Sequence, residues 1–218
     1  MSLNNYNTGK QYTKYKRHSN HSNEVIKAES VNKIQDDINA QQKETNEIIN
    51  YAFEERVYTI FNNNLYTNAM FIDPFRNGEF INMNRSNGML MDYENGILTL
   101  DKNNTHGFMT SSTVYSIHGA DVKMNDFFLI ANADVPSGAS IKYYIQNARN
   151  ERFPIQPNAL KLPMHLKEEL EAGFNVVIEM QVNGVGEKPQ LHGYAVIFWD
   201  AAVEADYGIT DPDLQRFP

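Results

Sequence analysis

The chain contains no cysteine among its 218 residues. This absence excludes disulfide bonds, cysteine-ligated zinc sites and a thiol nucleophile, so the fold depends on burial and on association. No stretch approaches the roughly 18 to 20 apolar residues of a membrane span, and the N-terminal segment lacks the apolar run of a signal peptide. We therefore expect a soluble protein with no membrane insertion and no Sec-type signal.

Basic residues are scarce, since 19 Lys and Arg stand against 27 Asp and Glu and give a net charge of -8. Nucleic acids and anionic membranes bind clusters of Lys and Arg, so we expect no nucleic-acid partner. The exception is residues 1–23, which contain no acid. A basic arm of this kind is either a disordered tail or a segment that docks on an acidic partner. We predict a docking arm that acts through Lys10, Lys14, Lys16 and Arg17.

Catalytic motifs are also absent. The sequence has no GxSxG, no HExxH and no dinucleotide-binding fingerprint. Residues 183–190, NGVGEKPQ, lack the Gly-Lys-Ser/Thr order of a phosphate loop and are interpreted as a polar hairpin loop. His18 and His21 are too few ligands for a structural zinc site. We therefore predict no enzymatic activity, no cofactor and no metal.

Several acidic residues lie near expected turns. None has the DxDxDG spacing of a calcium loop, and sequence alone cannot pair two of them across a hydrolase cleft. We interpret them as solvated turn residues, which Asp commonly provides. A calcium ion at a sandwich edge and a hydrolase remain the alternatives. The residues concerned are Asp92, Glu94, Asp101, Asp121, Asp126 and Asp134.

A long helix is predicted from about residue 24 to residue 66, because Ser22 or Asn23 suits an N-cap and no Pro or Gly follows before Pro74. We assign residues 24–72 to this helical segment, for oligomerisation or anchoring. Its most regular feature is a set of positions at alternating spacings of three and four, as in a heptad a/d pattern. We call these positions the seam: Val31, Ile34, Ile38, Gln41, Thr45, Ile48 and Ala52.

The helix has two candidate packing partners, its own β-domain and other copies of the chain. Polar residues in a heptad core are tolerated where they meet like residues across a symmetry axis. Gln41 and Thr45 therefore favour a coiled-coil-like parallel homo-oligomer, with a trimer preferred and a dimer as the alternative. After Ile48 the apolar positions drift to Ile49, Phe53, Val57 and Ile60, which indicates a phase shift or a change of packing partner.

Residues 73–205 are typical of a mainly β domain. An Asn95-Gly96 pair predicts a hairpin within residues 88–101. Strands are expected at 107–117, 127–131 and 140–146, in the run NVVIEMQVN with Val176, Ile178, Met180 and Val182 on one face, and in GYAVIFW. With a short helix near 164–171, the pattern indicates an antiparallel, jelly-roll-like β-sandwich. Residues 206–218 form an acidic tail, interpreted as either loose or a second docking segment.

Aromatic side chains suggest an alternative function, because sugar rings stack on Trp and Tyr. The candidates are Tyr115, Tyr144 and the single Trp199. Trp199 lies in an apolar strand, so a core position is favoured for it. The alternative to a structural protein is therefore a carbohydrate-binding adhesin or receptor-binding module whose partner is a cell-surface glycan.

Four runs carry a resemblance to a known group: NDFFLIANADVPSGASIKYYIQN, ERFPIQPN, FNVVIEMQVN and KPQLHGYAVIFW. Together with the preceding helix, they resemble virion structural proteins of tailed bacteriophages. In those proteins a galactose-binding-like or carbohydrate-binding-module-like jelly roll is carried on a helical oligomerisation segment. The likeness covers residues 20–200 in organisation and 125–199 in motif.

The resemblance implies a non-enzymatic part of a phage tail, baseplate, neck or head fibre. Its partners would be copies of itself and neighbouring virion proteins, and it would be located in the virion after assembly in the host cytoplasm. The single Trp and the lack of an evident aromatic platform depart from sugar-binding members. A structural role is therefore favoured over glycan binding.

Overall fold

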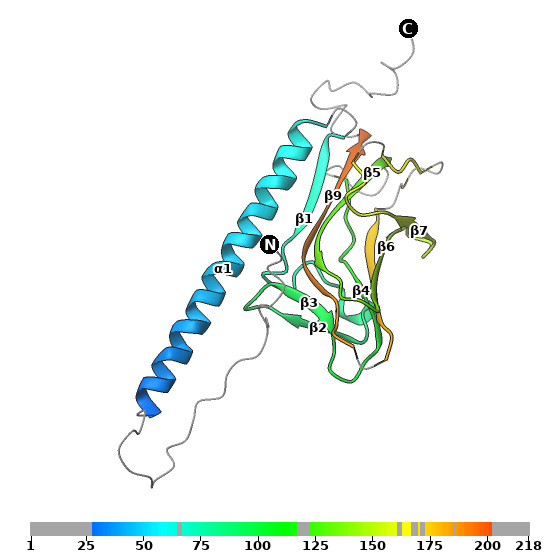
Figure 1. The fold of residues 1–218 in the computed structure, drawn as a ribbon. Helices are drawn as coiled ribbons and strands as arrows, with labels where there is room; N and C mark the ends of the chain where they lie inside the picture. The colour runs from blue at the N-terminus through cyan, green and yellow to red at the C-terminus, as the bar shows by residue number, and fades with distance from the viewer. Residues whose placement is uncertain are drawn as a thin grey trace, which may run out of the picture.

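A computed structural model describes residues 28–64, 67–116, 123–160, 163–166, 170, 173–184 and 186–201. One long helix precedes a β-domain of two antiparallel, sandwich-like sheets (Figure 1). The helix is α1 (Ala28–Asn62), and a 3-10 turn, η1 (Met83–Arg85), lies between the first two strands. The strands are β1 (Ala69–Asp73), β2 (Met89–Asp92), β3 (Ile97–Leu100), β4 (His106–Thr110), β5 (Met124–Asp134), β6 (Ala139–Gln146), β7 (Arg152–Ile155), β8 (Asn175–Val182) and β9 (Gln190–Asp200).

The five-stranded sheet is organised around β9. Strand β5 pairs along one edge of β9, while β1 and β3 pair with successive parts of its other edge, and β2 continues from β3. The predicted hairpin is confirmed as β2–β3, and Gly96 at its tip has φ +63, a value that suits glycine. The interpretation of residues 183–190 as a hairpin loop is wrong, because this segment leads from β8 in the four-stranded sheet to β9 in the five-stranded sheet and the two strands do not pair.

The four-stranded sheet has the order β4-β8-β6-β7, and every neighbouring pair is antiparallel. The predicted alternation in β8 is confirmed, since the four residues expected on one face are all buried in the core between the sheets. Phe127, Phe174 and Phe198 pack edge to face or stacked in this core, with ring centroids 5.1 to 5.9 Å apart.

Helix α1 covers the outer face of the five-stranded sheet and forms a third layer (Figure 1). Its 35 residues span about 52 Å at 1.5 Å per residue. Phe53 and Val57 are buried against Phe128, Ile130 and other residues of β5 and β9. The N-terminal part of the helix extends past the sheets (Figure 1), and the described contacts with the sheet come from residues 46 to 61, although Gln35 is also buried, at 7% exposure.

Several predicted boundaries are wrong. The helix ends at Asn62, and residues 69–72, assigned to the helical segment, belong to β1, which pairs with β9. Strand β1 is an edge strand that pairs only with β9, and its first four residues are half-buried, so its sequence has no alternation that would distinguish it from the preceding helix. The strand expected at 107–117 ends at Thr110. Within the expected helix at 164–171, Met164 instead forms a β-bridge with Phe127.

Candidate functional site

Two stripes of side chains run along α1. The first is the seam predicted above. The second, here called the sheet-facing stripe, consists of Asn46, Asn50, Phe53, Val57, Ile60 and Phe61. At 100° per residue, the average directions of the two stripes differ by about 120° around the helix axis. The two stripes therefore occupy different sides of one helix.

The seam is exposed to solvent in the single chain. Ile34, Ile38 and Ile48 are 57%, 43% and 62% exposed. The polar seam residues Gln41 and Thr45 are exposed as well, as is Ala52, while Val31 is half-buried. Complete burial of an exposed isoleucine contributes roughly 1.5 to 3 kcal/mol, so burying the exposed half of each of these side chains in a contact would contribute about half of that range.

The Thr45 hydroxyl already has a partner inside the helix. Its Oγ1 donates a hydrogen bond of 2.8 Å to the backbone oxygen of Gln41, one turn earlier. Because the hydroxyl is already hydrogen-bonded, the Thr45 methyl group can pack in an apolar contact and the side chain needs no further polar partner. Of the two polar seam positions, only Gln41 then needs a hydrogen-bonding partner in a contact.

The sheet-facing stripe begins with two asparagines that hold the β2–β3 hairpin. Asn46 Nδ2 donates a hydrogen bond of 2.8 Å to Asn95 Oδ1 at the hairpin tip. A Cβ atom on Gly96 would lie only 2.9 Å from Asn50 Nδ2, so the tip approaches the helix because glycine has no side chain. Both asparagines are buried, at 6% and 7% exposure, and the sequence pattern did not indicate this.

A glycine, Gly193 in β9, also allows the Phe53 ring to pack closely on the sheet. A Cβ atom on Gly193 would lie 3.2 Å from Phe53 Cε1 and 3.3 Å from the backbone oxygen of Asp73. The Asp73 carboxyl is 1% exposed, and its Oδ1 accepts the Phe75 N–H at 2.9 Å. Burial raises the pKa of Asp73 to about 6, against a smaller lowering by that backbone hydrogen bond.

The outer face of the four-stranded sheet forms a second candidate surface. We define this surface, the open face, by His106, Phe108, Lys142, Tyr144, Arg152 and Glu179, which are exposed or half-buried. The Arg152 guanidinium lies over two aromatic rings, 5.8 Å from the centroid of Phe108 and 6.0 Å from that of Tyr144. Sequence reasoning selected only Tyr144 of these. Alternation in HGFMT does place His106 and Phe108 on one face of their strand, but only the strand pairing brings the six residues together.

Glu179 at the centre of the open face is held by two neighbours. His106 Nε2 lies 2.9 Å from Glu179 Oε1, and the Tyr144 hydroxyl donates to Oε2 at 3.2 Å. The hydrogen bond with His106 is the largest cause that lowers the pKa of Glu179, and burial opposes it. Burial is also the largest cause that raises the pKa of Tyr144, and the Glu179 charge adds to it.

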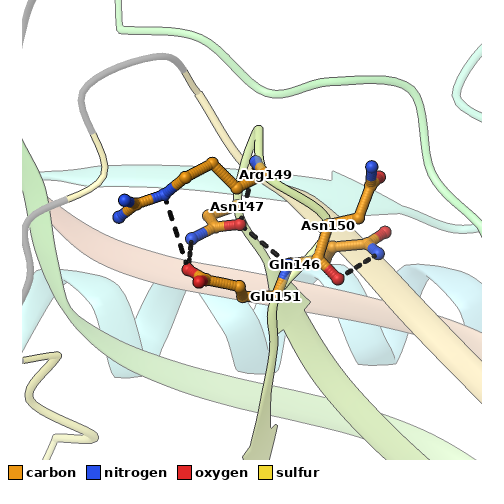
Figure 2. Close-up of polar contacts among 5 residues, drawn as sticks. All are labelled: Gln146, Asn147, Arg149, Asn150 and Glu151. Atoms are coloured by element: carbon orange, nitrogen blue, oxygen red, sulfur yellow. Dashed lines mark hydrogen bonds and ion pairs between the residues drawn. The ribbon is translucent and has the colours of Figure 1, made fainter.

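Arg85 lies at one end of the open face among amide groups. Its Nη2 donates to Gln146 Oε1 at 3.0 Å and to Asn150 Oδ1, and its Nη1 lies 3.4 Å from Asn175 Oδ1. Gln146 also donates to the backbone oxygen of Asn150 at 3.2 Å (Figure 2). Within the described ranges, neither Arg85 nor Arg152 forms an ion pair.

In the β6–β7 turn beside Arg85, the charged side chains of Arg149 and Glu151 pair with each other. Figure 2 shows Asn147 bonded within the turn: its Oδ1 accepts the N–H groups of Arg149 and Glu151 at 3.0 and 2.9 Å. Its Nδ2 donates to the Glu151 carboxylate, which also pairs with Arg149 Nε at 3.6 Å. Arg149 is thus compensated inside the turn, in contrast to Arg85 and Arg152.

The other predicted ligand aromatics lie elsewhere. Trp199 is 4% exposed in β9, as favoured for a core residue, and Tyr115 is 57% exposed in the segment after β4. A Cβ atom on Gly173 would lie 2.9 Å from the ring of Tyr115, so this tyrosine packs beside the entry to β8. The structure therefore does not bring these two rings to the open face with Tyr144.

The interpretation of the acidic residues as solvated turn residues is correct for Asp92 and Asp101 and wrong for Asp126. Asp92 Oδ1 accepts the N–H of Asn95 in the hairpin turn, and Asp101 accepts that of Lys102. Asp126 instead lies inside β5, 2% exposed and with φ +53, at a bulge that turns its carboxylate to His165. Asp121 lies outside the described residues.

Metal and membrane sites are not found in the part of the chain that the structure describes. No group of three or more His, Cys, Asp or Glu there could hold a metal ion. No described helix is long and apolar enough to cross a membrane. His18, His21, the four basic residues of the predicted docking arm and the 206–218 tail lie outside the described residues.

The sequence was compared with known proteins. It matches no protein-family model and no curated protein. The likeness to phage virion proteins thus rests on the four sequence runs and on the helix-then-sandwich organisation alone.

Proposed function

We propose that this chain is a non-enzymatic structural component that associates with copies of itself through the seam of α1. The observation that carries the proposal is the exposure of the seam isoleucines on the side of the helix away from the sheet. The sheet contacts the other stripe, so copies can meet at the seam without displacing the intramolecular contact. The sandwiches then lie on the outside of a central, coiled-coil-like helical bundle.

Charge placement along the seam favours parallel helices. With Val31, Ile38, Thr45 and Ala52 at a, the flanking g positions are Asp37 and Glu44, and the e positions include Gln42 and Ile49. Parallel helices bring g opposite the following e, which places each acid beside an uncharged residue. Antiparallel helices bring g opposite g, which places acid beside acid. A parallel homotrimer is preferred, with a parallel dimer as the alternative.

The setting that we propose is the virion of a tailed bacteriophage, where the chain would lie in a tail, baseplate, neck or head fibre. The support is the resemblance of residues 125–199 together with the helix-then-sandwich order. A jelly-roll connection of the strands belongs to the same proposal. The basic arm and the acidic tail would dock on neighbouring virion proteins, and assembly would take place in the host cytoplasm.

Self-association is tested by light scattering on the full chain at micromolar concentration. We expect a mass that is a multiple of 25.0 kDa, with three copies favoured. Ile38→Glu places a charge in the seam and should reduce the mass to that of one chain. Ala40→Glu adds the same charge to an exposed position off the seam, only two residues away, and should leave the mass unchanged.

A wild-type chain that is monomeric in this experiment, or a dissociation caused equally by Ala40→Glu, overturns the proposal. Point variants suit the test better than removal of residues 1–73. That deletion would also remove β1, which pairs with β9 through five residue pairs and would expose the edge of the sheet. The virion setting has its own test, since peptides of this chain must then occur in purified phage particles.

A further inference from the structure

The sequence contains four Asn-Gly pairs, which begin at Asn77, Asn87, Asn95 and Asn183. Asparagine before glycine is prone to deamidation, because glycine has no side chain to shield its backbone nitrogen. That nitrogen bonds to the carbonyl carbon of the asparagine side chain and loses its proton to water, while the side-chain nitrogen leaves as ammonia. Water then opens the resulting succinimide ring to aspartate or isoaspartate. Since all four pairs share this chemistry, the fold decides which of them reacts.

The attack requires a rotation about the Cα–C bond of the asparagine. This rotation brings the backbone nitrogen of the glycine onto the side-chain carbonyl carbon. A hydrogen bond to the asparagine side chain or to its backbone oxygen opposes the rotation, because it must be broken first. The hydrogen bonds at each pair therefore indicate how readily that pair reacts.

Asn95 is the most strongly restrained of the four. Its Oδ1 accepts a hydrogen bond of 2.8 Å from Asn46, and its Nδ2 donates one of 2.8 Å to Asp92 Oδ2. Its backbone N–H donates to Asp92 Oδ1 at 3.1 Å. Gly96 is buried, and a Cβ atom there would lie 2.9 Å from Asn50 Nδ2. The attacking nitrogen and the side chain are thus both held in place.

Asn87 and Asn77 are each restrained at one point. The Asn87 N–H and backbone oxygen both bond to Phe108, at 2.9 and 2.8 Å, which fixes the Cα–C bond of Asn87 in an extended conformation. The Asn77 side chain is held instead, because its Oδ1 accepts the N–H of Glu79 at 3.2 Å. Both asparagines are exposed, so water reaches them but the rotation is opposed.

Asn183 lacks these restraints. Asn183 and Gly184 are both exposed, and a Cβ atom on Gly184 would have no other atom within 4 Å. The Asn183 N–H donates to the backbone oxygen of Gly138 at 2.8 Å, a bond that precedes the rotating Cα–C bond and leaves it free. Within the described residues, no hydrogen bond holds the Asn183 side chain, its backbone oxygen or the Gly184 N–H.

We propose that Asn183 is a modification site at which the folded chain deamidates spontaneously, with water as the co-reactant, before the other three Asn-Gly pairs. The product places a new carboxylate in the connection from β8 to β9. Isoaspartate also adds one carbon atom to the main chain of this connection between the two sheets. The proposal does not rest on self-association or on the virion setting.

The test is peptide mapping by mass spectrometry after incubation of the full chain in mildly alkaline buffer, where the glycine N–H is deprotonated more readily. Digestion with an acid protease prevents deamidation during the work-up. We expect deamidation at Asn183 to be at least tenfold faster than at Asn95. In the urea-unfolded chain the two rates should agree within about threefold, because Asn95 then loses its hydrogen bonds.

Two variants refine the test. Asn183→Gln keeps the amide but lengthens the side chain, so closure to a succinimide is impossible and the modification of this peptide should disappear. Asn46→Ala removes one hydrogen bond from Asn95 and should raise the rate at Asn95 at least threefold, with no change at Asn183. Circular dichroism of each variant establishes that the fold is retained.

Three results would overturn the proposal. One is deamidation of another Asn-Gly pair before Asn183 in the folded chain. Another is the same ratio of the Asn183 and Asn95 rates in the folded and unfolded chains, which would show that the fold does not select the site. The third is an unmodified Asn183 in the folded chain after a time in which the unfolded chain has reacted.

Discussion

The two stripes of α1 lie on one helix and yet differ in composition and in surroundings. The sheet-facing stripe has Phe53, Val57 and Phe61 for contact with the β-sheet, and Asn46 and Asn50 where the hairpin tip approaches. The seam has only Ile, Val and Ala as apolar residues, with Gln and Thr between them. Aromatic rings fill the broad surface of a sheet, whereas β-branched residues at heptad spacing suit contacts between helices. The comparison teaches that one helix can carry two kinds of surface: the sheet-facing stripe contacts the sheet, and the seam is exposed in the single chain and is proposed to meet other copies.

The largest effect is expected where the sheet-facing stripe is broken. Phe53→Ala should lower the free energy of unfolding by about 3 to 5 kcal/mol, because it removes a buried ring and leaves a cavity above Gly193. Urea denaturation followed by circular dichroism measures the change. Tyr58→Ala, at a 44% exposed position on the same helix, should change it by less than about 1 kcal/mol. Equal losses in both variants would contradict the assignment of this stripe.

The next largest effect is the pH dependence of stability that comes from Asp73, the buried acid beside this stripe. The pKa of Asp73 is raised from 3.8 to about 6, so the folded state holds its proton more tightly than the unfolded state. Stability from this group is therefore present below pH 4 and is lost as the pH rises through 6. The loss is on the order of 2 to 3 kcal/mol, at 1.36 kcal/mol per pKa unit.

Asp73→Asn keeps an acceptor for the Phe75 N–H and removes the ionisation. The variant should show a smaller fall in unfolding free energy between pH 4 and pH 7 than the wild type, measured by urea denaturation at each pH. Asp37→Asn, at an exposed helical position, should retain the wild-type pH profile. An unchanged profile for Asp73→Asn would refute the role of this carboxyl.

A smaller effect is expected at the point where the hairpin meets the helix. The Asn46–Asn95 hydrogen bond should contribute about 0.5 to 1.5 kcal/mol. A double-mutant cycle with Asn46→Ala and Asn95→Ala measures this coupling in unfolding experiments. Additive effects of the two substitutions would show that the hairpin is not held by this pair.

The smallest effect on unfolding of the single chain is expected at the polar seam. Gln41→Leu should change the free energy of unfolding of the monomeric Ile38→Glu background by less than about 0.5 kcal/mol, because position 41 is exposed. In the wild-type background Gln41→Leu should strengthen self-association, and it should produce a mixture of oligomers with different numbers of chains. Light scattering over a dilution series measures both, and a single unchanged copy number would contradict the register role of Gln41.

Much of the fold could be predicted from local pattern. The Asn95-Gly96 turn, the one-sided burial of β8 and the change of stripe after Ile48 follow from turn chemistry and from periods of two and 3.6 residues. Strand β1 was missed, because five mixed residues after a long helix have no decisive period. Asp126 was misread for a similar reason, since a bulge inside a strand has no clear sequence signal.

The sequence by itself determined the helix, its heptad seam, the mainly β domain and the lack of cysteine chemistry, because each depends on residue type and near-neighbour spacing. Only the tertiary structure decided which stripe of α1 meets the sheet and that the seam faces away from it. It alone also placed Arg85, Phe108, Tyr144 and Arg152 on one surface. These contacts join residues distant along the chain, and their geometry follows from how strands and helix pack.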